Sequence, residues 1–232
     1  EFLVQPTKHN ESGWDETQRP KPPNVTLGAD WYEADVVLAQ TSYDLAELLI
    51  APDDLPIVYL SHNHADLEGT PPERIEKMCR GLVTISPMKR DSWLNAGYGG
   101  DVDVILPGVD LAEYADGKWM GQGGYLLSVI GQGGYVLSVI NGISRPLFDY
   151  QGWLRATERF PVNMVRLVGS HNEGCRGAVG PAPSWEALKA EYRGCLFYLN
   201  PTTGPYEDPY NLAALEAAAC GAPAHNLHGA PP

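Results

Sequence analysis

The chain has 232 residues, of which 44% are hydrophobic and 19% are charged, and this composition is typical of a folded globular protein. Its formal net charge of −13 at pH 7 argues against the nucleic-acid backbone as a partner, because binding phosphate needs a basic surface. No stretch approaches the ~18 apolar residues of a membrane span, and no basic and then apolar leader opens the chain, so we expect a cytoplasmic protein without a membrane span.

Residues 1–30 begin with a short strand-like run, Glu1 to Val4, and then become polar and proline-rich, which predicts a loop or an extended arm. An α/β domain normally begins with a strand and a glycine-rich turn, which this stretch lacks, so the chain is expected to start late, at a second or third strand. From Trp31 onward, apolar runs alternate with helical patterns, which predicts a parallel sheet with helices on both faces. The expected strands are residues 34–40, 56–60, 82–86 and 102–106, and the expected helices are residues 43–50, with Ser42 as N-cap, 72–79 and 88–95.

Residues 121–140 consist of a ten-residue segment and its near copy, which differ only at Leu126 and Val136. Two copies are too few for a solenoid, which needs at least ~3 repeats to bury a core. We interpret them as two strands, each preceded by a glycine turn, and a hairpin is one arrangement open to them. The functional alternative is a glycine loop around phosphate, but each Gly-x-Gly is followed by a run that indicates a strand rather than a helix.

The C-terminal part contains two acids in a loop-and-helix segment. Residues 201–209 contain three prolines and one glycine, so they predict an irregular loop. Residues 210–220 are strong helix formers that stop at Gly221, a residue suited to a left-handed C-terminal position. Asp208 lies at the loop-to-helix junction and Glu216 about two turns along the helix, and a capping acid with a solvated helix acid is the ordinary explanation. Before this segment, the patterns predict helices over 151–159 and 185–192 and strands over 162–168 and 195–199.

The cysteines Cys79, Cys175, Cys195 and Cys220 are widely spaced and contain no C-x-x-C pair. Two of them lie in apolar runs. The pattern therefore favours buried free thiols in a reducing cytoplasm over a disulfide framework or a zinc site.

The loop-and-helix segment resembles the donor-sugar site of the retaining GT-B glycosyltransferases of family 4 (glycosyl transferases group 1), whose pattern has two acids eight positions apart. Pro201 matches the first proline of that pattern, Asp208 and Glu216 match the two acids, and Gly221 matches its tail. In that family the first acid contacts the donor sugar and the second holds the nucleotide ribose. Asp208 is one methylene shorter than the usual glutamate, so the adjacent Glu207 is an alternative for the first role.

Other segments carry weaker parts of the same resemblance. His62 follows a predicted strand where the family often has a histidine beside the transferred sugar, and residues 106–110 resemble the turn into the second domain. Residues 139–150 resemble the segment in which an arginine and a lysine hold the donor diphosphate, but those two positions fall on Asn141 and Pro146. The residues expected at the site are His62, Asp208 and Arg145 as catalytic groups, and Glu216, Glu207, Gly142, Asn141, Asn211 and Leu212 as donor-binding groups.

The resemblance implies an α/β, GT-B-like protein of two Rossmann-like parallel-sheet domains, residues 1–112 on the acceptor side and residues 113–232 for the nucleotide-sugar, incomplete at both ends. The implied activity is transfer of a sugar from a nucleotide-sugar donor to an acceptor that the sequence does not identify, with retention and without a cofactor or bound metal. Because the basic pair is missing, transfer is expected to be weak or absent, and a non-catalytic binding or assembly module of the same fold is the alternative. A metal-dependent hydrolase that uses Asp44, His62, His64 and Asp66 is a third hypothesis.

Overall fold

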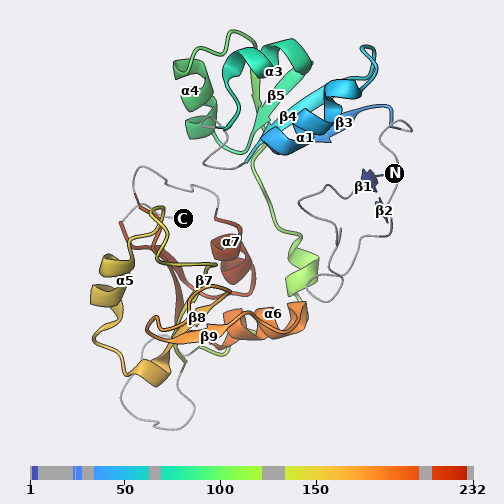
Figure 1. Ribbon diagram of the computed structural model, residues 1–232. Coiled ribbons are helices and arrows are strands. Elements are labelled where there is room, and N and C mark those ends of the chain that lie inside the picture. The colour runs from blue at the N-terminus through green and yellow to red at the C-terminus, as the bar shows by residue number, and fades with distance from the viewer. Residues whose placement is uncertain are drawn as a thin grey trace. The chain divides into compact units, whose positions relative to one another are not determined.

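The computed structural model describes residues 2–4, 23, 25–27, 34–62, 69–121, 134–203 and 211–228. The chain divides into two compact units, Glu1–Pro107 and Gly108–Pro232, each built on its own parallel β-sheet (Figure 1). The sheet of the first unit has four strands and that of the second has five, and helices connect most successive strands of each sheet. These two parallel sheets with helical crossovers confirm the α/β fold class that the alternating pattern predicts. No helix among the described residues is long and apolar enough to cross a membrane.

The sheet of the first unit has the strand order β3-β4-β5-β6, and every neighbouring pair is parallel. Each strand lies within or overlaps a run that the sequence predicts. Separately, the short strands β1 (Phe2–Val4) and β2 (Val25–Leu27) form a parallel pair of their own. The elements of the first unit are β3 (Val37–Ala39), α1 (Ser42–Glu47), the 3₁₀ helix η2 (Leu48–Ile50), β4 (Ile57–Ser61), α3 (Pro72–Met78), β5 (Gly81–Thr84), α4 (Pro87–Asn95) and β6 (Val102–Val104).

Helix α1 begins one residue earlier than the sequence predicts, with Thr41 rather than Ser42 as its N-cap. The Thr41 hydroxyl accepts a hydrogen bond from the Asp44 amide at 3.2 Å, and the Asp44 carboxylate accepts one from the Thr41 amide at 2.8 Å. This reciprocal pair is a capping box, which satisfies two amides that the helix itself leaves unpaired. Ser42 is therefore the first helical residue.

The strands of the first unit bury one face of their sheet more deeply than the other. Along β4, residues 57, 59 and 61 are buried and residues 58 and 60 are half-buried. Leu45, Ile75 and Trp93, which are buried side chains of the three α-helices, join one cluster on the first of these faces. On the opposite face Leu38 is 52% exposed. The expectation of helices on both faces is therefore wrong for the described part of this unit.

The sheet of the second unit has the strand order β11-β10-β7-β8-β9, again with all neighbouring strands parallel. The sequence patterns predict the inner strands and the helices to within a few residues, but they miss the two edge strands. The elements are η3 (Leu111–Tyr114), β7 (Val136–Val139), α5 (Tyr150–Thr157), η4 (Val162–Met164), β8 (Val165–Val168), β9 (Ala178–Gly180), α6 (Trp185–Gly194), β10 (Phe197–Asn200), α7 (Leu212–Ala219) and β11 (Ala224–Asn226).

Strand β7 is formed by the second copy of the ten-residue repeat. It pairs in parallel with β8 on one side and with β10 on the other, so both of its edges are occupied. A hairpin between the two copies would need one of these edges and an antiparallel partner, so the hairpin interpretation is wrong. Residues 122–130 of the first copy lie outside the described residues.

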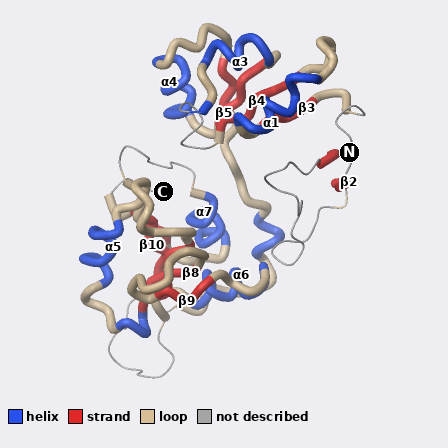
Figure 2. Tube along the Cα trace, viewed as in Figure 1, coloured by secondary structure: helices blue, strands red, loops and turns tan. Residues whose placement is uncertain are grey.

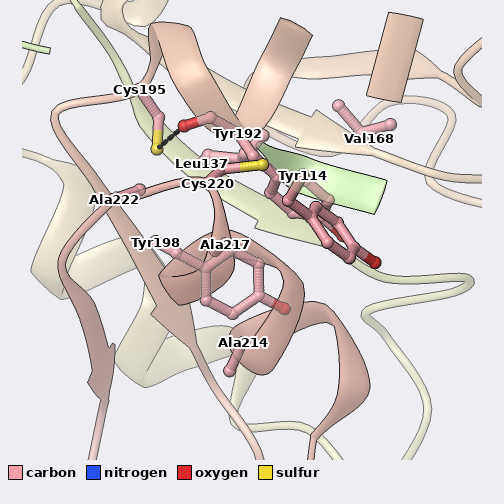
Figure 3. Close-up of a cluster of buried hydrophobic side chains, with 10 residues drawn as sticks. All are labelled: Tyr114, Leu137, Val168, Tyr192, Cys195, Tyr198, Ala214, Ala217, Cys220 and Ala222. Atoms are coloured by element: carbon pink, nitrogen blue, oxygen red, sulfur yellow. Dashed lines mark hydrogen bonds between the residues drawn. The ribbon is translucent and has the colours of Figure 1, made fainter. Parts of the chain in front are cut away.

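This second sheet carries helices on both faces (Figures 1 and 2). Trp153 of α5 packs in one cluster with Val136 of β7, whereas Tyr192 of α6 and Ala217 of α7 pack in another cluster with Leu137 (Figure 3). Adjacent strand residues point to opposite faces, which is why Val136 and Leu137 belong to different clusters. The inner strands are consequently buried on both sides, as is usual for a parallel sheet.

Candidate functional site

The strand order of the second unit reverses between β7 and β10. From β7 the chain adds β8 and β9 on one side, and it then returns to add β10 and β11 on the other. In open parallel sheets, ligands bind outside the carboxyl ends of the strands at such a reversal, because the loops there diverge to opposite faces. The segments after Val139 and Asn200 are therefore the expected ligand-binding edge of this unit.

The two segments are joined by backbone hydrogen bonds. The Asp149 amide donates to the Pro201 carbonyl oxygen at 2.8 Å, and the Thr203 amide donates to the Leu147 carbonyl oxygen at 3.0 Å. An isolated antiparallel bridge between Phe148 and Thr202 lies between these bonds. The loop after β7 and the loop after β10 are thus held together as one structural feature.

The first part of the loop after β7 contains Asn141 and Gly142, two predicted donor-binding residues. Gly142 has a φ of +68°, which favours glycine, and its amide donates to the Ser170 carbonyl oxygen at 2.9 Å. The Asn141 side-chain oxygen accepts a hydrogen bond from the Ser170 amide at 2.8 Å. Both residues are therefore anchored to the loop that follows β8.

Asn172 also forms hydrogen bonds with this turn, and the sequence prediction does not include it. Its side chain is 2% exposed, and its oxygen accepts a hydrogen bond from the Ile143 amide at 2.8 Å. Its amide nitrogen donates to the carbonyl oxygens of Ile140, at 2.6 Å, and Gly169, at 3.2 Å. Sequence alone gives no signal for it, because an asparagine in a polar loop is ordinary and two of its partners, Ile143 and Ile140, lie 29 and 32 residues away.

Arg145, the basic group predicted beside the donor diphosphate, folds back onto its own loop. Its Nε donates to the Gly142 carbonyl oxygen at 3.4 Å, and its guanidinium carbon lies 5.4 Å from the centre of the Phe148 ring. The residue is exposed. A cation over an aromatic face is weakly held at an exposed position, so the side chain can turn toward a bound anion.

Helix α7 begins at this edge and carries three predicted site residues. Asn211 is its N-cap, because the side-chain oxygen accepts a hydrogen bond from the Ala214 amide at 2.9 Å. The same oxygen lies 3.4 Å from the donating hydroxyl of the buried Tyr198. Leu212, the first residue of the helix, is 49% exposed. Gly221, just beyond the helix, has the left-handed φ of +86° that the sequence predicts.

Glu216 is half-buried on α7 and is bonded to a core tyrosine. Its Oε2 accepts a hydrogen bond from the Tyr192 hydroxyl at 2.9 Å. Burial raises the pKa of Tyr192 well above its ordinary value, and the negative charge of Glu216 adds to the shift. The hydroxyl therefore stays protonated, as a donor, throughout the physiological pH range.

A network of amide side chains links α7 to the end of β10. Asn200 is 2% exposed, and its side-chain oxygen accepts hydrogen bonds from the Thr202 hydroxyl at 2.7 Å and from the Asn211 amide nitrogen at 3.4 Å. Its own amide nitrogen donates to the Asn226 side-chain oxygen, at the end of β11, at 3.0 Å. The network fixes the starting point of α7 relative to the strands. The sequence prediction does not include Asn200.

The remaining predicted site residues fall elsewhere. Glu207 and Asp208 lie outside the described residues. His62 belongs to the first unit, where it follows β4 as an exposed residue and its Nδ1 lies 3.4 Å from the Leu60 carbonyl oxygen. The structure therefore brings Asn141, Gly142, Arg145, Asn211, Leu212 and Glu216 onto one unit, around the reversal of its sheet.

The described residues contain no group of three or more histidine, cysteine or acidic side chains that could hold a metal ion. Asp44 is one of the four residues of the metal-hydrolase hypothesis, and its carboxylate accepts a hydrogen bond in the capping box of α1. His64 and Asp66 lie outside the described part of the chain. The hydrolase hypothesis therefore gains no support.

A surface hollow of about 430 Å³ lies beside α5, and none of the predicted site residues lines it. At its edge the Asp149 carboxylate faces the Arg155 guanidinium at 3.8 Å and the His228 imidazole at 3.4 Å. The Arg155 side chain is 69% exposed and the His228 side chain 41% exposed, which limits the strength of these contacts. The hollow is lined by Asp149, Gly152, Arg155, Ala156, Arg159, Leu227 and His228.

The chain, with its two parallel-sheet units, matches solved structures that have the fold of the GT-B glycosyltransferases. One is the structure of Anabaena Alr3699/HepE in complex with UDP-glucose, with a TM-score of 0.60 and 17% identity, over 84% of this chain and 60% of that chain. The same protein in complex with UDP and glucose matches with a TM-score of 0.59 and 17% identity, over 84% and 59% of the two chains.

A third structure is an alpha-glucosyltransferase in complex with UDP-glucose and DNA containing an abasic site, with a TM-score of 0.52 and 10% identity, over 86% of this chain and 64% of that chain. No family model and no curated protein matches the sequence. At these identities the similarity is one of fold. The chain spans about three fifths of the length of the HepE structures.

Proposed function

We propose that the second unit binds the donor of a glycosyltransferase reaction, a UDP-sugar, and that the chain is a retaining GT-B glycosyltransferase, or a part of one, related to family 4. The observation that carries the proposal is the clustering of six predicted site residues around the sheet reversal. Three structures of similar fold, from two proteins, were solved with UDP-glucose or with UDP and glucose, and they support the choice of nucleotide. The similarity in fold alone would not select a ligand.

The ribose is assigned to Glu216. The Tyr192 hydroxyl donates a hydrogen bond to Oε2 of this carboxylate and so holds it in place. The two vicinal hydroxyls of a ribose are donors that a fixed carboxylate binds in a bidentate manner. Asn211 and Leu212 begin the same helix, and the partial positive charge of its first turn favours the donor diphosphate.

The diphosphate is further assigned to the loop after β7. Gly142 brings the backbone close to the ligand without a side chain, while Asn172 and Ser170 keep the loop in a single conformation. Arg145 supplies the positive charge if it turns away from Phe148. The sugar is assigned to Asp208 or Glu207.

Chemistry at such a site depends on stabilising the charge that develops on the departing diphosphate, which is usually the largest electrostatic contribution to catalysis. Asn141 and Pro146 occupy the positions of the two basic residues in the related family, and Arg145 is stacked on Phe148. This observation favours a second candidate function, a non-catalytic module that retains donor binding. We therefore propose strong nucleotide binding with weak sugar transfer.

The proposal is tested by thermal unfolding of the full chain in the presence of UDP, UDP-glucose, ADP or glucose. A ligand that binds only the folded state stabilises it by an amount that grows with the ratio of ligand concentration to Kd, and so raises the unfolding temperature. UDP and UDP-glucose are expected to raise it progressively as their concentration rises above Kd, whereas glucose leaves it unchanged. Equal shifts with UDP and ADP would support a diphosphate site without base selection, and the absence of any shift with UDP would overturn the proposal.

A further inference from the structure

Glu216 is the one polar side chain in α7, whose sequence is Leu-Ala-Ala-Leu-Glu-Ala-Ala-Ala. The alanines at 214 and 217 are buried, which allows the helix to lie close to α6 and to β10. Side chains from α6 can therefore reach across and contact the polar group of α7. The side chain that does so is Tyr192.

The position of the Tyr192 hydroxyl is fixed by the core. The residue is fully buried, and its ring lies 6.3 Å from the ring of Tyr198 within the cluster of Figure 3. Its carbonyl oxygen accepts a hydrogen bond from the Cys195 thiol at 3.2 Å, so the end of α6 is also held. A buried aromatic ring in a close-packed cluster has a single rotamer, and its hydroxyl points in one direction.

The carboxylate of Glu216 has less rotamer freedom than that of an ordinary solvated helix glutamate. A solvated glutamate samples several rotamers, and a ligand that needs one of them must immobilise the side chain on binding. The hydrogen bond from Tyr192 removes part of that cost before a ligand arrives. The charged acceptor also makes this bond stronger than one between neutral groups.

We propose that Tyr192 is a positioning residue for ribose recognition: its hydroxyl, fixed in the core, orients the Glu216 carboxylate toward the ribose hydroxyls of the nucleotide. The inference rests on the proposed function, because it assigns Glu216 to the ribose. Tyr192 touches no ligand. Its contribution is to nucleotide affinity and to discrimination between nucleotides with and without ribose hydroxyls.

A purely structural role for Tyr192 makes a different prediction. If the hydroxyl only satisfies a buried polar group, its removal lowers stability and alters the binding of all nucleotides alike. If it orients Glu216 toward the ribose, its removal weakens only those ligands that present the 2′- and 3′-hydroxyls. Comparison of UDP with 2′,3′-dideoxy-UDP separates the two roles within one variant.

The experiment is isothermal titration calorimetry of the full chain with UDP and with 2′,3′-dideoxy-UDP. The wild-type protein is expected to prefer UDP, and Tyr192→Phe is expected to weaken UDP binding roughly three- to tenfold while dideoxy-UDP binding is unchanged. In a Glu216→Gln background, Tyr192→Phe is expected to have little further effect on UDP. A smaller effect in that background is the signature of two residues that act through one contact.

Tyr135→Phe is the matched control. The Tyr135 hydroxyl donates to the Glu191 carbonyl oxygen of the same helix at 3.1 Å, so the variant also removes one tyrosine hydroxyl bonded to a partner on α6. It is expected to leave both titrations unchanged. Tyr192→Met serves as a second variant without the hydroxyl, because methionine fills irregular core space, and the same selective loss is expected.

The remaining outcomes would contradict, separately, the role of Tyr192, the recognition of the ribose and the proposed function. Equal losses for both nucleotides, or an undiminished loss in the Glu216→Gln background, would show that Tyr192 acts through packing alone. Equal wild-type affinities for UDP and dideoxy-UDP would show that no carboxylate binds the ribose hydroxyls. A wild-type protein that binds neither nucleotide would contradict the proposed function itself.

Discussion

The side-chain oxygen of Asn172 accepts a hydrogen bond from the backbone amide of Ile143 at 2.8 Å, across 29 residues of sequence. Both residues are buried, and the asparagine also donates to two carbonyl oxygens of the neighbouring loops. One amide side chain thus ties the loop after β7 to the loop after β8. The edge proposed to hold the donor diphosphate is rigid because of it.

Asn172→Ala is therefore expected to destabilise the protein by about 2–4 kcal/mol, because it leaves a buried amide and buried carbonyls without a partner. Chemical denaturation measures the loss, with the exposed Asn163→Ala as a control that changes stability by less than about 0.5 kcal/mol. UDP affinity is expected to fall as well. A variant as stable as the wild type would contradict the bracing role of Asn172.

Arg145 is the basic residue expected to act on the leaving diphosphate. Losses of charge-stabilising groups typically cost about 2.7–4 kcal/mol each in the transition state, so the two missing basic residues predict a rate lower by roughly four to six orders of magnitude. UDP release from UDP-glucose by the wild-type chain is expected to be slow, and Arg145→Ala is expected to slow it further while UDP binding weakens less. Rapid UDP release that is unchanged by Arg145→Ala would contradict the alignment of residues 139–150 with the family segment that holds the donor diphosphate.

The two faces of the first sheet differ in burial, and matched substitutions test the difference. Leu82 is 1% exposed within the helix-covered cluster, whereas Leu38 is 52% exposed on the opposite face. Leu82→Ala is expected to cost about 2–5 kcal/mol, as is usual for a buried leucine, and Leu38→Ala less than about 1 kcal/mol. Similar costs in urea unfolding would indicate that the outer face is also covered.

Thiol reactivity reports on the core of the second unit. Burial raises the pKa of Cys195 to about 12, so only about one thiol in ten thousand is ionised at pH 8. Because the thiolate is the reactive form, alkylation of Cys195 by iodoacetamide is expected to be very slow at pH 8 and to accelerate as the pH rises. Mass spectrometry of native and urea-unfolded protein measures this, and equal labelling in the two states would contradict the burial of Cys195.

Local sequence patterns predicted the elements that have a clear signal within their own residues. Continuous apolar runs identify the inner strands β4 and β10, and an alanine-rich run with Gly221 beyond it identifies α7. The edge strands β9 and β11 were missed because each has three residues and no apolar run. The repeat left a hairpin open as an arrangement because it contains no information on which distant strand will occupy each edge of β7.

The same limit applies to the site. The acids and the loop after β7 were proposed from their resemblance to a family motif, and a motif is a local property of the sequence. The residues that hold them could not, because Tyr192 and Glu216 are 24 positions apart and meet only when α6 packs on α7. Asn200 likewise meets its partner Asn226 only because β10 and β11 lie side by side in the folded sheet.

Calorimetric titration of the full chain with UDP tests the central proposal most directly, with Glu216→Gln as the paired variant. The account predicts saturable binding of one UDP per chain by the wild type and affinity at least about tenfold lower in the variant, since a hydrogen bond to a charged group contributes about 1.5–3 kcal/mol. Glu186→Gln, an exposed glutamine substitution on α6, is expected to bind UDP as the wild type does. No binding by the wild type, or equal affinity in wild type and Glu216→Gln, would contradict a nucleotide-sugar site at this edge of the sheet.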